Sequence, residues 1–185
     1  MNDINCIKMK IEKIIKKSMI PEDPIHSKNT LEWLIRIKPN SDIALQIAAL
    51  GHDIERAIED RKIRRSDYRN YNDFKKAHAS NSANILKEIM KNCNADKGFA
   101  EEVYDLVRCH EKGGSIKGNL LREADSISFF DVNLPFYYKR NSVKETKRRI
   151  FWGLERLSDE LMGIITKFKY EDKELGKLVK LSLIH

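Results

Sequence analysis

Apolar residues recur three and four positions apart along almost the whole chain, and this helical spacing constrains the fold more than any other feature of the sequence. No run alternates between apolar and polar residues for long enough to predict a strand. Only 8 Gly and 4 Pro interrupt the pattern within 185 residues. The sequence therefore predicts an all-α protein.

Proline, glycine and polar segments separate the expected helices. We expect helices over residues 5–19, 25–37, 43–50, 73–92, 96–109 and 119–130, a turn starting at Pro135, a long amphipathic region over 143–168, and a short helix within 171–185. The helix over 43–50 is apolar on nearly every side, which is typical of a buried central helix, and Ser41 or Asp42 can cap its start. Residues 59–72 are polar and basic, and they predict an irregular connection.

Length and composition indicate one soluble domain spanning residues 1–185. Lys and Arg total 35 against 28 Asp and Glu, and the net charge of +7 favours anionic partners such as nucleotides, phosphoesters or nucleic acid. No apolar stretch approaches the length that spans a bilayer, and no signal peptide is apparent, so we expect a cytoplasmic protein without membrane contact. The odd number of cysteines, without a CxxC pair, suits a reducing cytosol better than a disulfide framework: Cys6, Cys93 and Cys109.

Histidines are the most informative residues, because four of the five lie inside predicted helices or at their ends: His26, His52, His78 and His110. His52 precedes Asp53 at the end of the most apolar helix, where a buried carboxylate needs a strong partner such as a metal cation. Asp125 lies on another largely apolar helix. Taken singly, each residue has an ordinary explanation as a solvated, capping or ion-paired side chain, so only the joint pattern indicates a site.

That joint pattern resembles the HD superfamily of metal-dependent phosphohydrolases. Members place a histidine on an early helix, an adjacent His-Asp pair on a central helix and an aspartate on a later helix, and the matching residues here are His26, His52 with Asp53, and Asp125. The resemblance covers about residues 24–130. It implies an HD-domain helical bundle whose metal-binding core is followed by C-terminal helices over 135–185.

His78 and His110 resemble the two further histidines of HD proteins that bind two metal ions, and the stretch from His110 to Asp125 is similar to HD hydrolases of dinucleoside polyphosphates. The resemblance implies two divalent transition-metal ions (Mn, Fe, Ni, Co or Zn), which imidazole-rich sites prefer. His26, His52 and Asp125 would bind one ion, His78 and His110 the other, and Asp53 both. The implied reaction is hydrolysis of a nucleotide or other small phosphoester by a metal-bound hydroxide.

Two features depart from the family pattern. Arg56 stands where many two-metal members carry lysine, three residues after the bridging aspartate; arginine can hold a phosphoryl oxygen but cannot donate a proton near neutral pH. We therefore expect Asp53 and Arg56 to be catalytic, with Arg56 contacting phosphate, and no general acid is identified: Glu55, the nearest carboxylate, is one residue away from the glutamate of some mononuclear nucleotidases. The GYP signature of cyclic-dinucleotide phosphodiesterases is absent after His110. Residues 47–125 also resemble a family of unknown function, which leaves the substrate open.

Basic residues outside these motifs supply further candidates. Lys112 and Lys117 flank a glycine-rich loop beside His110, and we expect them to reach a substrate phosphate. The basic residues between 56 and 69 can clamp a phosphate or form a solvated loop. A solvent-exposed face is expected for a more distant set: Lys139, Arg140, Lys144, Lys147, Arg148 and Arg149. Trp33, two helical turns after His26, is expected to pack beneath the site.

Two alternatives remain open at this point. A few HD proteins with this number of ligands hold two irons and oxidise small substrates with dioxygen. The chain could also be a non-catalytic module whose basic surface binds nucleic acid or a protein. Metal content and an oxygen-dependent spectrum would separate the first alternative from a hydrolase, and salt-dependent oligonucleotide binding without turnover would support the second.

Overall fold

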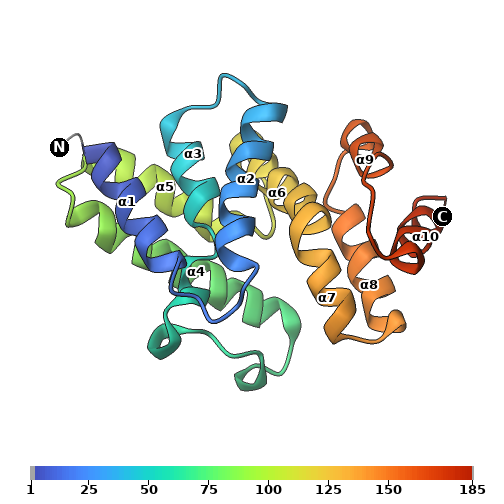
Figure 1. The fold of residues 1–185 in the computed structure, drawn as a ribbon. Coiled ribbons are helices and arrows are strands. Elements are labelled where there is room, and N and C mark those ends of the chain that lie inside the picture. Colours follow the sequence, from blue (N-terminus) through green and yellow to red (C-terminus); the bar gives the residue numbers. More distant parts are fainter. Residues whose placement is uncertain (1–2, 185) are drawn as a thin grey trace.

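The computed structural model describes residues 3–184, and all regular secondary structure in this range is helical (Figure 1). The all-α prediction is therefore confirmed. The α-helices are α1 (Asp3–Ile15), α2 (Asp23–Ile37), α3 (Ile43–Gly51), α4 (Tyr71–Lys91), α5 (Lys97–Cys109), α6 (Ile116–Ser128), α7 (Leu134–Arg140), α8 (Val143–Leu154), α9 (Asp159–Ile165) and α10 (Lys173–Ser182).

Helix boundaries follow local capping chemistry. Asp42 rather than Ser41 caps α3, because its side chain accepts a hydrogen bond from the Leu45 backbone N–H at 2.9 Å. Ser115 caps α6 in the same way, so this helix begins at Ile116, three residues before the predicted start. The connection predicted over 59–72 is irregular up to Tyr71, where α4 begins, and it contains short 3₁₀ turns at Glu59–Arg61 and Arg65–Asp67. A further 3₁₀ turn precedes it at Ile54–Ala57.

The prediction of one long amphipathic helical region over 143–168 is wrong in detail, because the chain breaks between α8 and α9. Leu154 and Leu157, on either side of the break, are both buried against the core. Arg156 lies between them, is only 5% exposed and ion-pairs with two carboxylates in the interior. A continuous amphipathic helix would not present all three residues to the interior.

The core is organised around α3, against which α1, α2, α5 and α6 pack. Ile47, Ala48 and Ala49 of α3 are completely buried, which explains why this helix is apolar on all sides. Its neighbours contribute one apolar face each, through side chains such as Ile7 and Ile11 of α1 and Val103 and Val107 of α5. Burial of these faces provides the main stabilisation of the fold.

The C-terminal helices lie on one side of this core. A π-helical turn at Phe129–Asn133 joins α6 to α7, so residues 116–140 form a nearly continuous helical rod. Figure 1 shows α7, α8, α9 and α10 on the opposite side of the molecule from α1. Gly153 of α8 packs closely on this rod: a Cβ at this position would lie 2.9 Å from the Phe130 ring.

A disulfide joins Cys6 of α1 to Cys93, just beyond the end of α4, and it corrects the expectation of unpaired cysteines. The sequence pattern did not show it because the two residues are 87 positions apart and come together only when α1 packs on α4. Cys109 is free. Within residues 3–184, no helix has the length and apolar character needed to cross a membrane.

Candidate metal centre

The six residues predicted to bind metal come together from five parts of the chain. His26 lies in the first turn of α2, His52 and Asp53 follow the end of α3, and His78 lies within α4. His110 follows the end of α5, and Asp125 lies on α6. They form two groups, in each of which the potential ligand atoms lie within 4.8 Å of one another: His26, His52 and Asp125; Asp53, His78 and His110.

Asp53 lies between the two groups. Its Oδ1 atom is 2.8 Å from His78 Nε2 and 3.8 Å from His110 Nε2 in its own group, and 3.7 Å from His52 Nε2 in the other. Asp125 Oδ1 is 3.2 Å from His26 Nε2 and 3.3 Å from His52 Nε2. This arrangement matches the predicted division of ligands, with Asp53 in the position of a bridge.

Hydrogen bonds orient the histidine rings so that every Nε2 atom faces inward. His52 and His110 each donate from Nδ1 to the backbone carbonyl three residues earlier, Ala49 at 3.0 Å and Val107 at 2.7 Å. A carbonyl only accepts, so in both rings Nδ1 carries the proton, and in the neutral ring Nε2 is free to bind a metal. Both carbonyls belong to the last turn of a helix, and that of Val107 also accepts the His110 backbone N–H at 3.2 Å.

The other two rings are held through side chains. His78 Nδ1 lies 2.6 Å from Glu55 Oε1, and the other Glu55 oxygen accepts a hydrogen bond from the Ile63 N–H at 2.7 Å. His26 Nδ1 lies 2.8 Å from the Ser128 hydroxyl, which itself donates to the His26 carbonyl. Such second partners fix the ring orientation of metal-binding histidines. Glu55 therefore has the structural role of positioning His78.

The donor set fits a transition-metal cation. His52 Nε2 is buried and makes no hydrogen bond to any of the residues 3–184, although an unpaired buried polar atom is costly. Four imidazole nitrogens and two carboxylates, all facing one another, are ligands that Mn, Fe, Co, Ni or Zn accept. A bound cation would satisfy the orphaned nitrogen and offset the carboxylate charges.

The electrostatic environment keeps both carboxylates ionised. Burial opposes ionisation of Asp53, but His52, His78 and Arg56 outweigh it and hold the pKa of Asp53 well below its usual value. Asp125 behaves in the same way, chiefly because of Arg156. Burial lowers the pKa of His110 to about 4, so this ring is neutral at pH 7, the form that binds a metal.

Arg56 connects the centre to α2. Its Nη1 lies 3.0 Å from Asp53 Oδ2, and its Nη2 lies 3.0 Å from Asp23 Oδ1. This double contact orients Asp53 so that Oδ1 faces the histidines. The Arg56 side chain is 28% exposed and lines the adjoining cavity, so it retains donors for a ligand.

Arg156 is the corresponding cation for Asp125, and sequence reasoning missed it. Its Nη2 lies 2.5 Å from Asp125 Oδ2 and its Nη1 lies 2.6 Å from Glu111 Oε2. Glu111 also pairs with Lys75, and its Oε1 is 3.7 Å from His110 Nε2. No sequence signal distinguishes Arg156 from the many other basic residues, because its partners are brought together only by the fold.

A cavity of about 420 Å³ opens beside the metal ligands. Asp53, His78 and Asp125 line its inner end. The other walls combine cations and aromatic rings from three regions, the 3₁₀ turns, α4 and α8: Lys62, Arg64, Arg65, Tyr71, Phe74, Lys75, Arg149 and Trp152. The cavity is therefore suited to a small anionic ligand.

Residues 7–179 match the protein-family model described as Domain of unknown function (DUF4202). The chain belongs to this family. No curated protein and no solved structure matches. The matched range of the DUF4202 chain contains all six candidate ligands together with Arg149, Trp152 and Arg156.

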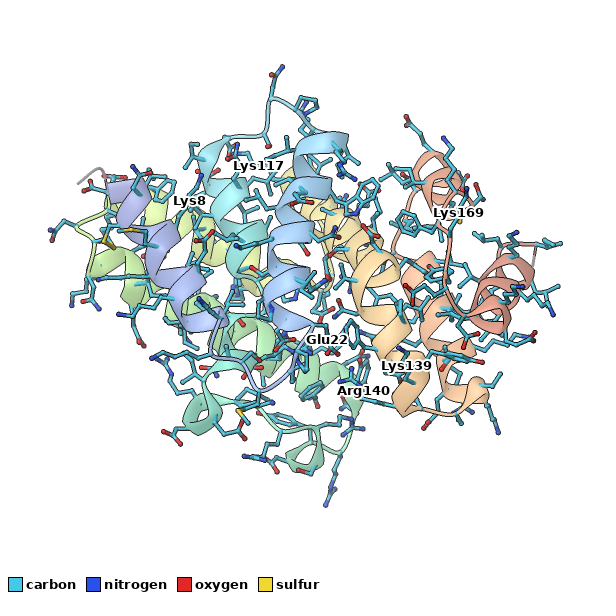
Figure 2. All side chains as sticks on the ribbon, in the orientation of Figure 1. Lys8, Glu22, Lys117, Lys139, Arg140 and Lys169 are labelled. Atoms are coloured by element: carbon cyan, nitrogen blue, oxygen red, sulfur yellow. A yellow bond between two sulfur atoms is a disulfide. The ribbon has the colours of Figure 1, made fainter. Side chains whose placement is uncertain are left out.

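The DUF4202 fold does not bring Lys112 or Lys117 to the cavity. Lys117 Nζ lies 2.6 Å from Asp42 Oδ2 and also pairs with Glu102. Figure 2 shows Lys117 near the start of α3, whereas His52 follows the end of that helix. Lys112 is exposed and does not line the cavity. Proximity to His110 in sequence was misleading, because the chain turns away at Gly113 and Gly114, both at positive φ.

Trp33 and Arg149 lie elsewhere than expected, whereas Arg140 is exposed as expected. Trp33 does not line the cavity; its Nε1 donates to Asp131 at 2.9 Å and its ring packs against Phe168. Arg140 pairs with Glu22, and Figure 2 shows these two residues close together. Arg149, which was expected on a solvated face, lines the cavity.

Proposed function

We propose that the chain is an HD-type metal-dependent phosphohydrolase that acts on a nucleotide or other small phosphoester. The observation that carries this proposal is the pair of His/Asp groups around Asp53, with the Nε2 atoms of four histidines facing inward. The cation-rich cavity beside these groups supports a phosphorylated substrate.

The candidate residues would have different roles in this reaction. His26, His52 and Asp125 would hold one divalent ion, His78 and His110 the second, and Asp53 both. When bound, the two ions would supply a water molecule of lowered pKa and neutralise the phosphoryl oxygens. Arg56 orients Asp53 and presents its remaining N–H groups to a phosphate in the cavity.

One further polar group in the cavity supports recognition of a small polar substrate. The Asn133 side chain is only 9% exposed and lines the cavity, and its Oδ1 atom has no hydrogen-bond partner among the described residues. Such an atom can accept a hydrogen bond from a substrate hydroxyl or amine. The substrate we propose therefore carries polar groups beside its phosphate.

The first experiment is to measure metal content per chain in protein purified without chelator or nickel, followed by a panel of phosphoesters. We expect nearly two transition-metal ions per chain. Asp53→Ala should lose both ions and reduce hydrolysis by more than about a thousandfold, while the circular dichroism spectrum stays helical. The matched control is Asp60→Ala, which removes an exposed carboxylate and should retain both ions and activity.

Each alternative predicts a different outcome. Retained hydrolysis in Asp53→Ala would overturn the mechanism. Iron with an oxygen-dependent spectrum and no phosphoester cleavage would instead indicate a diiron oxygenase. No bound metal after loading with Mn, Fe or Ni, together with salt-dependent oligonucleotide binding, would indicate a non-catalytic module.

A further inference from the structure

Arg149 is held in the cavity by aromatic contacts instead of an ion pair. Its guanidinium carbon lies 3.8 Å from the centre of the Trp152 ring and 5.1 Å from that of Phe129. Its Nη1 donates to the Tyr71 hydroxyl at 2.9 Å. Within residues 3–184, no carboxylate forms an ion pair with it. Arg149 is therefore a half-buried cation whose orientation is fixed and whose charge is not balanced.

This distinguishes Arg149 from three other arginines in or near the cavity. Arg56 pairs with Asp53 and Asp23, and Arg156 pairs with Asp125 and Glu111. Arg64 pairs with Glu59. These three cations already have carboxylate partners on the protein, whereas Arg149 has its charge free for a ligand.

Arg65 repeats this pattern on the other side of Tyr71. Its guanidinium carbon lies 5.9 Å from the centre of the Tyr71 ring, and it donates to the Tyr68 carbonyl. No carboxylate of the described chain pairs with it. Tyr71 thus contacts three cavity-lining cations, Arg65 and Lys75 through its ring and Arg149 through its hydroxyl. Lys75 pairs with Glu111, whereas the other two have no carboxylate partner among the described residues.

The unbalanced cations line the same cavity as the candidate ligands Asp53, His78 and Asp125. Arg156 connects the two places, because its guanidinium carbon is 4.3 Å from the centre of the Trp152 ring while its Nη2 is 2.5 Å from Asp125. The position of α8 is also fixed, since the Ser126 hydroxyl of α6 donates to the Gly153 carbonyl at 2.7 Å. Two anionic groups on one small molecule can therefore reach both places at once.

We infer that Arg149, with Arg65 and Tyr71, forms a second anion site, which binds one phosphoryl group of the substrate while another lies at the metal ligands. The substrate class is then a compound that carries at least two phosphoryl groups. Its assignment as a substrate rests on the proposed function, whereas the anion site does not. Three cations, those of Lys75, Arg149 and Arg156, lie within 4.3 Å of the Trp152 ring centre, so this wall recognises charge rather than a stacked base.

Calorimetric titration of the metal-loaded protein tests the inference. The probes are AMP, with one phosphate, and the α,β-methylene analogue of ADP, which resists cleavage and has two. Arg149→Gln should weaken binding of the ADP analogue about tenfold or more and change AMP binding by less than about twofold. Arg149→Lys keeps the charge and should weaken binding of the ADP analogue less than Arg149→Gln does.

The matched control is Arg148→Gln, which removes the same charge from an exposed neighbouring position and should change neither affinity by more than about twofold. Equal weakening of both nucleotides by Arg149→Gln, or no weakening of the ADP analogue, would overturn the second anion site. Arg149-dependent binding in a protein that cleaves no phosphoester would refute the proposed function and retain the site. Hydrolysis of phosphoesters by a protein whose affinity for the ADP analogue does not depend on Arg149 would support the proposed function and overturn the second anion site.

Discussion

The metal-ligand region, α2 to α6, and the C-terminal region, α7 to α10, contribute to one cavity in different ways. The first supplies all six candidate ligands, whose residue types and spacing are recognisable in the sequence. The second supplies Arg149 and Trp152 to the cavity wall and Arg156 as the partner of Asp125, and all three resemble any other residues of a basic amphipathic helix and its end. The comparison shows that rare residue types indicate a candidate site in the sequence, whereas a cation that lines this site is recognised only by its partners.

Arg156→Met breaks the ion pairs that link the two regions. It leaves Asp125 without its strongest partner and removes one of the two cations that pair with Glu111, so we expect the free energy of unfolding to fall by about 3–5 kcal/mol in metal-free protein. Urea denaturation measures this loss. Arg148→Met, at an exposed position, is the control and should change stability by less than about 0.5 kcal/mol. Equal effects of the two substitutions would show that the regions are not coupled through Arg156.

Cys6→Ser tests the metal-ligand region without changing the C-terminal region, since the disulfide joins α1, which packs on α2, α3 and α4, to the end of α4. Loss of this disulfide, whose cysteines are 87 positions apart, should lower the free energy of unfolding by about 2–4 kcal/mol under oxidising conditions. Cys109→Ser removes the free cysteine and should have little effect. Titration of three free thiols in native protein would contradict the disulfide, and titration of one would count against the reducing cytosol predicted from the sequence.

The pH dependence of metal-free protein should also originate in the metal-ligand region. Burial opposes protonation, but carboxylates, led by Asp53, raise the pKa of His52 to about 9 and of His78 to about 10, from an ordinary 6.5. The folded state therefore keeps protons that the unfolded chain releases, and this stabilisation is complete below pH 6.5 and lost as the pH rises to 10. We expect Tm to fall across this window.

Metal-loaded protein measured in the same buffers is the control for this pH series. A bound cation takes the place of the protons on His52 and His78, so its Tm should change much less between pH 6.5 and 10. Metal affinity should rise over the same window, because protons compete for the same nitrogens. A parallel decline of Tm in both forms would assign the titration to other groups.

Lys117→Gln should have the smallest effect, because Lys117 does not line the cavity and pairs with exposed carboxylates of Asp42 and Glu102. We expect kcat/KM to stay within about twofold and stability to change by less than about 1 kcal/mol. Arg56→Gln removes a cation that lines the cavity and should lower kcat/KM about a hundredfold. Similar losses in the two variants would restore Lys117 as a substrate contact.

Much of the fold was predictable because helical periodicity is a local property. Helix α3 was recognised as central from its apolar composition alone, and its burial follows directly. The break after Leu154 was not predictable, because Arg156 beside it forms ion pairs with Glu111 and Asp125, which are distant in the sequence. The pairing of Cys6 with Cys93 was missed for the same reason, since neither residue marks its partner in the sequence.

The amino-acid sequence by itself determined the helical class and the identity of the six candidate ligands, because periodicity and ligand type are properties of the residues themselves. Only the tertiary structure decided which charges are already balanced. Lys117 has two carboxylate partners and Arg149 has none among the described residues, although both are cations in a basic chain. Charge balance depends on distances of a few ångströms between residues far apart in sequence, and only packing sets those distances.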